Sequence, residues 1–236
     1  MFDAPPVTLQ PTDPAVLAGH ALALNLIGKL LYAPPEPEAL RALAAEGVFA
    51  ELPFDSDRPA VTDGLACLQR WADSHLAGDA AAGFAAVRAD FTRLFEGPGR
   101  VLAAPWESVQ RNGDHLLFQT ETLQVRTWYR RFGLQLTRLH QEPDDHVGLE
   151  LAFVSHLAQL ALAAHAAGDA ARWAELIEAQ AVFLRTHPQR WVPAWSALVI
   201  TEARTDYYRG LAHLAGGVLA ELEAALSAWP PAKAAA

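Results

Sequence analysis

The sequence contains a single cysteine, Cys67, among 236 residues. A lone cysteine forms no internal disulfide, and without a C-x-x-C pair the chain has no cysteine-based metal or redox motif. Neither lysine nor arginine occurs before Lys29, so the basic start of a secretory signal is missing. The longest uncharged apolar stretch near the N-terminus covers 14 residues, 15–28, and is too short to span a bilayer. These absences predict a soluble, cytoplasmic protein.

The chain also lacks a surplus of basic residues, because its formal net charge is −9 at pH 7. Nucleic-acid binding needs a basic surface, so the charge argues against a nucleic-acid partner. An acidic chain would attract a basic partner, although acidity also serves solubility alone. Hydrophobic residues make up 52% of the sequence and charged residues 19%, which is typical of a globular protein with a sizeable core.

Apolar residues show no convincing alternation with period 2, whereas several segments repeat at the 3.6-residue period of a helix. Thr12 or Asp13 is placed to cap a first helix with Pro14 in its first turn. Further helices are expected at about 36–46, 59–77, 80–96, 120–133, 145–167 and 170–187, with one or two more after a break at 187–195. The prediction is an all-α fold, a single helical domain of about nine or more helices.

Residues 97–119 lack helical periodicity and form a long expected loop in the middle of the chain. A loop of this length inside a compact domain is usually functional or mobile. It would act as a hinge between two helical subdomains, 12–96 and 120–228. Such a hinge is compatible with a monomer or with a domain-swapped dimer.

Ionisable residues crowd the entrance of the apolar helix expected from 145, where the sequence reads EPDDHVGLE. Pro143 favours extended backbone at Glu142. Asp144 or Asp145 would cap the helix and meet the positive end of its dipole. His146 and Glu150 are four residues apart and therefore share one face of the expected helix.

Several uses would suit these residue types. A metal site needs three or four ligands, and no second motif completes the pair His146 and Glu150. Acid–base catalysis by Asp145 and His146 would need a nucleophile, and G-x-S-x-G, H-E-x-x-H, P-loop and G-x-G-x-x-G motifs are absent. No metal, cofactor or enzymatic activity is therefore predicted. A helix cap with an exposed His–Glu pair, and recognition of a ligand at the helix entrance, both stay open.

Four segments together resemble a known family. EPDDH at 142–146 resembles the E-P-x-D-H motif of the TorD/DmsD/NarJ superfamily, and FTRLF at 91–95 resembles its aromatic-x-x-L-F motif. APWESV at 104–109 and RWVPAW at 190–195 resemble its P-P-W-x-S-V and W-x-P segments. The four matches occur in family order, span most of the chain and are closest to the TorD/DmsD branch.

The sequence departs from the family pattern at a few positions. Phe91 stands where some members have Trp or Tyr, and Ala104 replaces the first proline of the P-P-W segment. Gly99 and Gln119 stand where some relatives have Trp and Gly. The departures at Gly99 and Gln119 bear on how much the 97–119 segment contributes to a binding groove.

The resemblance implies a cytoplasmic chaperone, without catalytic activity, for a molybdoenzyme exported by the twin-arginine route. Such a chaperone binds the twin-arginine leader of the catalytic subunit, assists cofactor insertion and delays export until folding is complete. Its membrane contact would be at most indirect, through the export machinery. Carried over position by position, the peptide-binding residues would be Asp145, His146, Glu142, Pro143, Asp144, Phe91, Leu94 and Trp106.

The chemistry of such a leader suits these residues. Arginines favour carboxylates, and an apolar helical core favours a groove lined with aromatic and leucine side chains. A stripe at helical spacing is usually core, however, and this applies to Phe95 most, to Leu94 next and to Phe91 least. Two other hypotheses are a helical adaptor for an unrelated peptide and a nucleotide-responsive switch, which would lack a glycine-rich phosphate loop.

Overall fold

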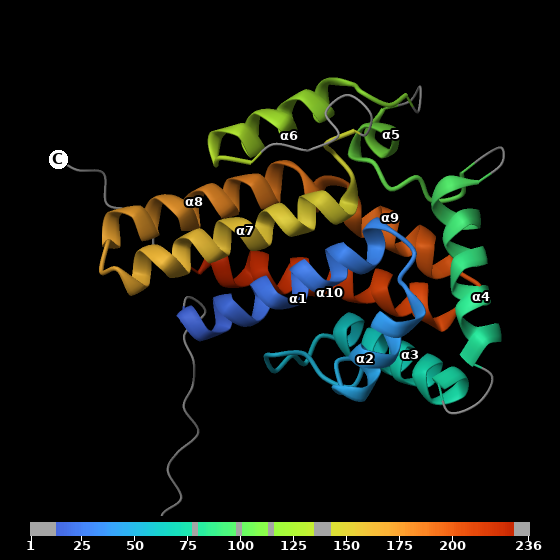
Figure 1. Ribbon diagram of the computed structural model, residues 1–236. Coiled ribbons are helices and arrows are strands. Elements are labelled where there is room, and N and C mark those ends of the chain that lie inside the picture. The colour runs from blue at the N-terminus through green and yellow to red at the C-terminus, as the bar shows by residue number, and fades with distance from the viewer. Residues whose placement is uncertain (1–12, 77–79, 98–100, 113–115, 135–142, 229–236) are drawn as a thin grey trace, which may run out of the picture.

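The computed structural model describes residues 13–76, 80–97, 101–112, 116–134 and 143–228 (Figure 1). These residues form ten α-helices and one π-helical turn, and they contain no β-strand. The elements are α1 (Pro14–Tyr32), α2 (Pro37–Ala45), α3 (Pro59–Leu76), α4 (Ala80–Phe91), η1 (Thr92–Glu96), α5 (Glu107–Arg111), α6 (Thr120–Arg131), α7 (Val147–Ala166), α8 (Ala170–Thr186), α9 (Pro188–Glu202) and α10 (Asp206–Ser227). The predicted all-α fold of nine or more helices is confirmed.

Local sequence signals set several helix ends. The Asp13 side chain accepts a hydrogen bond of 2.8 Å from the Ala15 backbone N–H, and Pro14 occupies the first helical position, as the sequence predicts. Gly47 and Gly133 follow α2 and α6 with φ values of 74° and 78°. A residue with a β-carbon is strained in this left-handed region, which explains why glycine ends both helices.

The core is built from helices of both halves of the chain. Helix α1 packs against α7, and α3 packs against α10, while α8 and α9 complete the layers around α7 and α10 (Figure 1). The α1–α7 crossing is close because glycines face each other: a β-carbon on Gly148 would lie 2.6 Å from the Gly28 carbonyl oxygen. The division into subdomains 12–96 and 120–228 stays a prediction.

Two expectations about irregular segments were wrong. The segment expected as a loop over 97–119 contains the short helix α5. The expected break at 187–195 is confined to His187, because α9 begins at Pro188 and continues through Pro193. Proline at the first helical position loses no hydrogen bond, and Pro193 removes a single one. Burial of Trp191 and Trp195 in the core offsets that loss.

Helices α1 and α7 are long and apolar enough, by length and composition alone, to cross a membrane. Helix α1 exceeds the 14-residue stretch noted in the sequence because it continues through Lys29 to Tyr32. In the fold, 56% and 61% of the two apolar windows are buried, and the helices pack against each other. Burial in the core accounts for their composition.

Candidate functional site

The helix entrance singled out from the sequence is a buried turn at residues 143–146. Asp145 and His146 expose 0% and 3% of their surface, and Pro143 and Asp144 are also buried. Glu142 lies outside the described residues. The turn pairs with the segment before α5 through an antiparallel bridge between Trp106 and His146. Two of the motif-bearing segments therefore form one structural unit.

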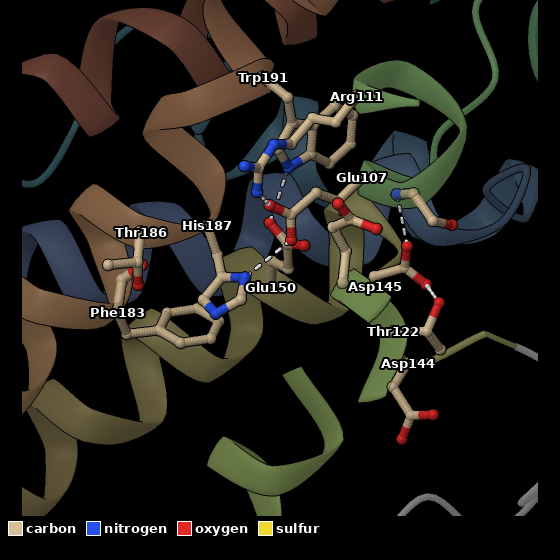
Figure 2. A network of polar contacts seen from close by, with 12 residues as sticks. Glu107, Arg111, Thr122, Asp144, Asp145, Glu150, Phe183, Thr186, His187 and Trp191 are labelled. Carbon is tan, nitrogen blue, oxygen red and sulfur yellow. Dashed lines mark hydrogen bonds and ion pairs between the residues drawn. The ribbon is translucent and has the colours of Figure 1, made fainter. Parts of the chain in front are cut away.

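The Asp145 carboxyl group links α5 to α6. One oxygen accepts the Ser108 backbone N–H at 2.7 Å, and the other accepts the Thr122 hydroxyl at 2.8 Å (Figure 2). Burial raises the pKa of this carboxyl, against the lowering effect of its hydrogen bonds. Asp145 thus caps the second residue of α5 and not α7, which corrects the expected cap. Both of its oxygens are occupied by internal donors.

The Asp144 carboxylate already holds an arginine from within the chain. Its Oδ2 atom accepts the Arg126 Nε–H at 2.9 Å and Nη2–H at 2.6 Å. Its backbone carbonyl accepts the Tyr129 hydroxyl at 3.0 Å. Arg126 and Tyr129 both belong to α6, so Asp144 fastens this helix to the turn.

His146 is the residue that caps α7. Its Nδ1 atom accepts the Gly148 backbone N–H at 3.0 Å. The ring meets the edges of Tyr32 and Trp106, with centroids 5.2 and 5.8 Å away. Burial lowers the His146 pKa to about 3, so the imidazole is neutral at neutral pH and its Nδ1 lone pair is free to accept. The cap expected at Asp144 or Asp145 is therefore supplied by the neighbouring imidazole.

Glu150 is not part of an exposed His–Glu pair, because it is fully buried. Its Oε2 accepts the Trp191 indole N–H at 3.0 Å. Burial, followed by the nearby Glu107 carboxylate, raises the Glu150 pKa well above its ordinary value. Glu107 in turn binds His187 Nδ1 at 2.8 Å and Arg111 Nη1 at 2.5 Å (Figure 2).

We call this set of buried groups the polar hub: Asp144, Asp145, His146, Glu150 and Glu107. The sequence argument missed Glu107, although it lies inside the APWESV segment used for the family resemblance. It also missed that RWVPAW supplies the Trp191 donor. The usable signal was that two motif-bearing segments, APWESV and RWVPAW, contain a charged residue next to tryptophan. Among the described residues, no group of three or more His, Cys, Asp or Glu side chains is placed to hold a metal ion.

The two apolar residues of helical segments that were expected to line a groove, Phe91 and Leu94, lie in the core. They are 4% and 0% exposed, and Phe95 is 1% exposed, as expected of a stripe at helical spacing, for Phe95 most and for Leu94 next. The Phe91 ring packs against Phe95 and Tyr208. Trp106 is half-buried, and its indole N–H has no hydrogen-bond partner among the described residues.

An exposed apolar patch borders the hub on the side of α6. A hollow of about 390 Å³ there is lined by Phe118, Thr122, Leu123 and Arg126, and two of these, Thr122 and Arg126, hold the hub aspartates. Phe118 has a φ of 59°, a left-handed conformation that is uncommon for a bulky residue. The patch consists of four side chains that are 38–57% exposed: Leu116, Leu117, Phe118 and Leu123.

Fold and hub together define an all-helical protein in which buried polar contacts join the EPDDH and APWESV segments, and the RWVPAW segment is hydrogen-bonded to Glu150 of α7. The family model described as "Nitrate reductase delta subunit" matches residues 55–197, which is more than half of the chain. The chain belongs to this family, and the resemblance to the TorD/DmsD/NarJ superfamily is confirmed.

Similar proteins carry chaperone names. The Tat proofreading chaperone DmsD of Salmonella typhi is 31% identical over 134 residues, 57% of this chain and 59% of the relative. The chaperone protein TorD of Vibrio cholerae is 31% identical over 108 residues, 46% and 47% of the two chains. TorD of Actinobacillus pleuropneumoniae is 27% identical over 190 residues, 78% and 83% of the two chains. The match thus spans about 59% of the length of the DmsD relative.

Proposed function

We propose that the protein is a cytoplasmic chaperone that binds the twin-arginine leader of a molybdoenzyme catalytic subunit. It would assist cofactor insertion and delay export until the subunit has folded. The observation that supports this most is family membership, together with relatives named Tat proofreading chaperone and TorD chaperone. The net charge of −9 also favours a ligand with a basic start.

Within this proposal the hub residues act by positioning the surfaces that a leader would touch. Asp145 fixes α5 relative to α6, and Asp144 fixes α6 through Arg126. His146 packs against Tyr32 at the end of α1. Their carboxyl and imidazole groups have internal partners, so a change at one of them would alter leader binding through the placement of α1 and α6.

The contribution of the remaining predicted contacts differs from residue to residue. Trp106 is half-buried beside the hub, and we propose that its accessible part contacts the peptide directly. Phe91 and Leu94 are buried, so we propose that they support the fold behind the hub. Pro143 shapes the turn that precedes His146.

The proposal is tested by co-expressing the protein with a molybdopterin oxidoreductase catalytic subunit that carries a twin-arginine leader. The subunit is prepared with its leader, without its leader, and with the arginine pair changed to alanine. We expect a complex on gel filtration with the complete precursor only. A complex of equal yield with the leaderless subunit would show that the chain recognises another part of its client, and the proposed leader binding would be wrong.

A further inference from the structure

A second hollow among the described residues lies away from the hub, along α1. It has a volume of about 440 Å³, which is within the range of ligand sites in proteins. Its lining residues come from α1, from residues 43–53, which α1 faces across the hollow, and from α3 and α10. Its lining is mostly apolar: Leu22, Ala23, Leu26, Ile27, Leu30, Leu43, Val48, Phe49, Leu52, Pro53, Leu68, Leu211 and Leu214. We call it the α1 groove.

The exposed face of α1 beside this groove has few polar side chains. Its exposed positions recur at helical spacing, and the list reads Ala15, Ala18, Leu22, Lys29 and Tyr32. Leu22 is 61% exposed, more than any other large hydrophobic residue described. Surface helices normally place polar residues on their solvent side. The exposed face of α1 carries one charged residue, Lys29, and lies next to an apolar hollow. Such a surface is suited to packing against another apolar helix.

The opposite side of the groove carries negative charge. Residues 33–57 contain six acidic residues and one basic residue, Arg41, a net charge of −5 over this segment. Two of the six, Glu46 and Glu51, line the groove, and both are exposed. Neither forms an ion pair with a described residue, whereas Lys29 is the only cation in the lining. The groove is therefore complementary to a helix that is apolar along its length and basic at one end.

Helix α1, which forms one side of the groove, also contacts the polar hub at its C-terminal end. Tyr32, the last residue of α1, lies edge-on to His146 with ring centroids 5.2 Å apart. Ten residues separate Leu22 from Tyr32, which is about 15 Å along a helix at 1.5 Å per residue. A helical peptide of three turns lying along α1 would reach from the groove to the hub. His146 therefore contacts the end of the helix that forms one side of the groove.

We infer that the α1 groove binds the apolar helical core of the twin-arginine leader, with the leader's basic residues against Glu46 and Glu51. This inference rests on the proposed function and assigns it a surface. Apolar side chains of the leader would fill the hollow in the helix-in-groove mode. The two free carboxylates would accept arginine N–H groups in charge-assisted hydrogen bonds.

The test compares two matched substitutions on exposed leucines, Leu22→Glu in the groove and Leu123→Glu in the apolar patch of α6. The two side chains are 61% and 57% exposed, so neither change disturbs the core. The probe is a fluorescently labelled synthetic peptide with an arginine pair followed by an apolar, helix-forming stretch. Binding is measured by fluorescence anisotropy. We expect Leu22→Glu to weaken binding about tenfold or more, the loss that follows when a leucine no longer buries its surface.

The outcomes separate this inference from the proposed function. Loss of affinity in Leu22→Glu with nearly unchanged affinity in Leu123→Glu supports the groove. Loss confined to Leu123→Glu, or equal in both variants, overturns the groove while leaving leader binding intact. Absence of peptide binding in the unaltered protein overturns both the groove and the proposed function.

A second variant tests the acidic side. The double substitution Glu46→Gln and Glu51→Gln keeps the shape of both side chains and removes their charge. It should weaken binding of the arginine peptide several-fold at low salt and leave a peptide with alanines in place of the arginines unaffected. Equal effects on the two peptides would show that these carboxylates do not meet the basic residues.

Discussion

Replacing Asp145 by alanine tests whether this residue is a structural link inside the hub. The carboxyl group accepts hydrogen bonds from the Ser108 backbone N–H and the Thr122 hydroxyl. Both donors lie in residues that are fully buried, so no water replaces the lost acceptor. Leaving a buried donor unsatisfied costs about 1–3 kcal/mol. Two such donors, less the relief of the carboxyl's own desolvation, give an expected destabilisation of about 2–4 kcal/mol.

The assay is thermal unfolding followed by circular dichroism. For a chain of this size each 1 kcal/mol lowers Tm by about 2–4 °C, so Asp145→Ala should lower it by roughly 5–15 °C. Asp145→Asn keeps the side-chain shape and one good acceptor, and should lower Tm by less than half as much. Thr122→Val removes a single donor and serves as the matched control. If Asp145→Ala melts within about 2 °C of the unaltered protein, the carboxyl does not hold α5 to α6.

Three further changes test the packing and the buried ionisable groups. Gly148→Ala should lower Tm, because the added β-carbon would lie 2.6 Å from the Gly28 carbonyl oxygen. The expected cost is about 1–3 kcal/mol. Gly216→Ala is the control: its β-carbon would have its nearest contact at 3.5 Å, so this change should be neutral or stabilising. His146 has a folded-state pKa of about 3 against an ordinary 6.5. Its contribution to the free energy of unfolding is therefore present above about pH 6.5 and is lost as the pH falls toward 3. His146→Asn keeps a helix cap without this titration, so it should unfold less readily in acid than the unaltered protein. The pKa of Glu150 is raised by folding. Its contribution to the free energy of unfolding is therefore full below about pH 4.5, the ordinary pKa, and is lost as the pH rises through the folded-state pKa. The Tm of Glu150→Gln should rise relative to that of the unaltered protein as the pH goes from acid to neutral. A constant Tm difference across pH in either titration would contradict the assignment.

Most of the helices could be predicted because the signals that set them are local. Asp13 and Pro14 define the start of α1, and Gly47 and Gly133 end α2 and α6 with positive φ values. The apolar stripe that ends at Phe95 predicted a buried helix face correctly. Helix α9 was missed because proline is a helix breaker only on average. The tryptophans on either side of Pro193 are buried, and their packing outweighs one lost backbone hydrogen bond.

The candidate site was only partly predictable. The sequence drew attention to Asp144, Asp145 and His146, and the structure places them together in one turn. Their burial and their partners could not be deduced, because Thr122 and Arg126 lie about 20 residues away in the chain and no spacing rule connects them. Only three-dimensional packing shows that the aspartates are satisfied internally. The α1 groove was invisible for the same reason, since its sides come from α1, α3, α10 and the segment 43–53.

The central claim is that this chain binds a twin-arginine leader. The most direct measurement is a calorimetric titration of the purified protein with a leader peptide, beside the same peptide with its arginine pair changed to alanines. The account predicts binding in the micromolar range or tighter, about −8 kcal/mol or more favourable, with clear weakening when the arginines are removed and when salt is added. Absence of binding to the twin-arginine leader peptides of molybdopterin oxidoreductases, or equal affinity for the two peptides at every salt concentration, would contradict it.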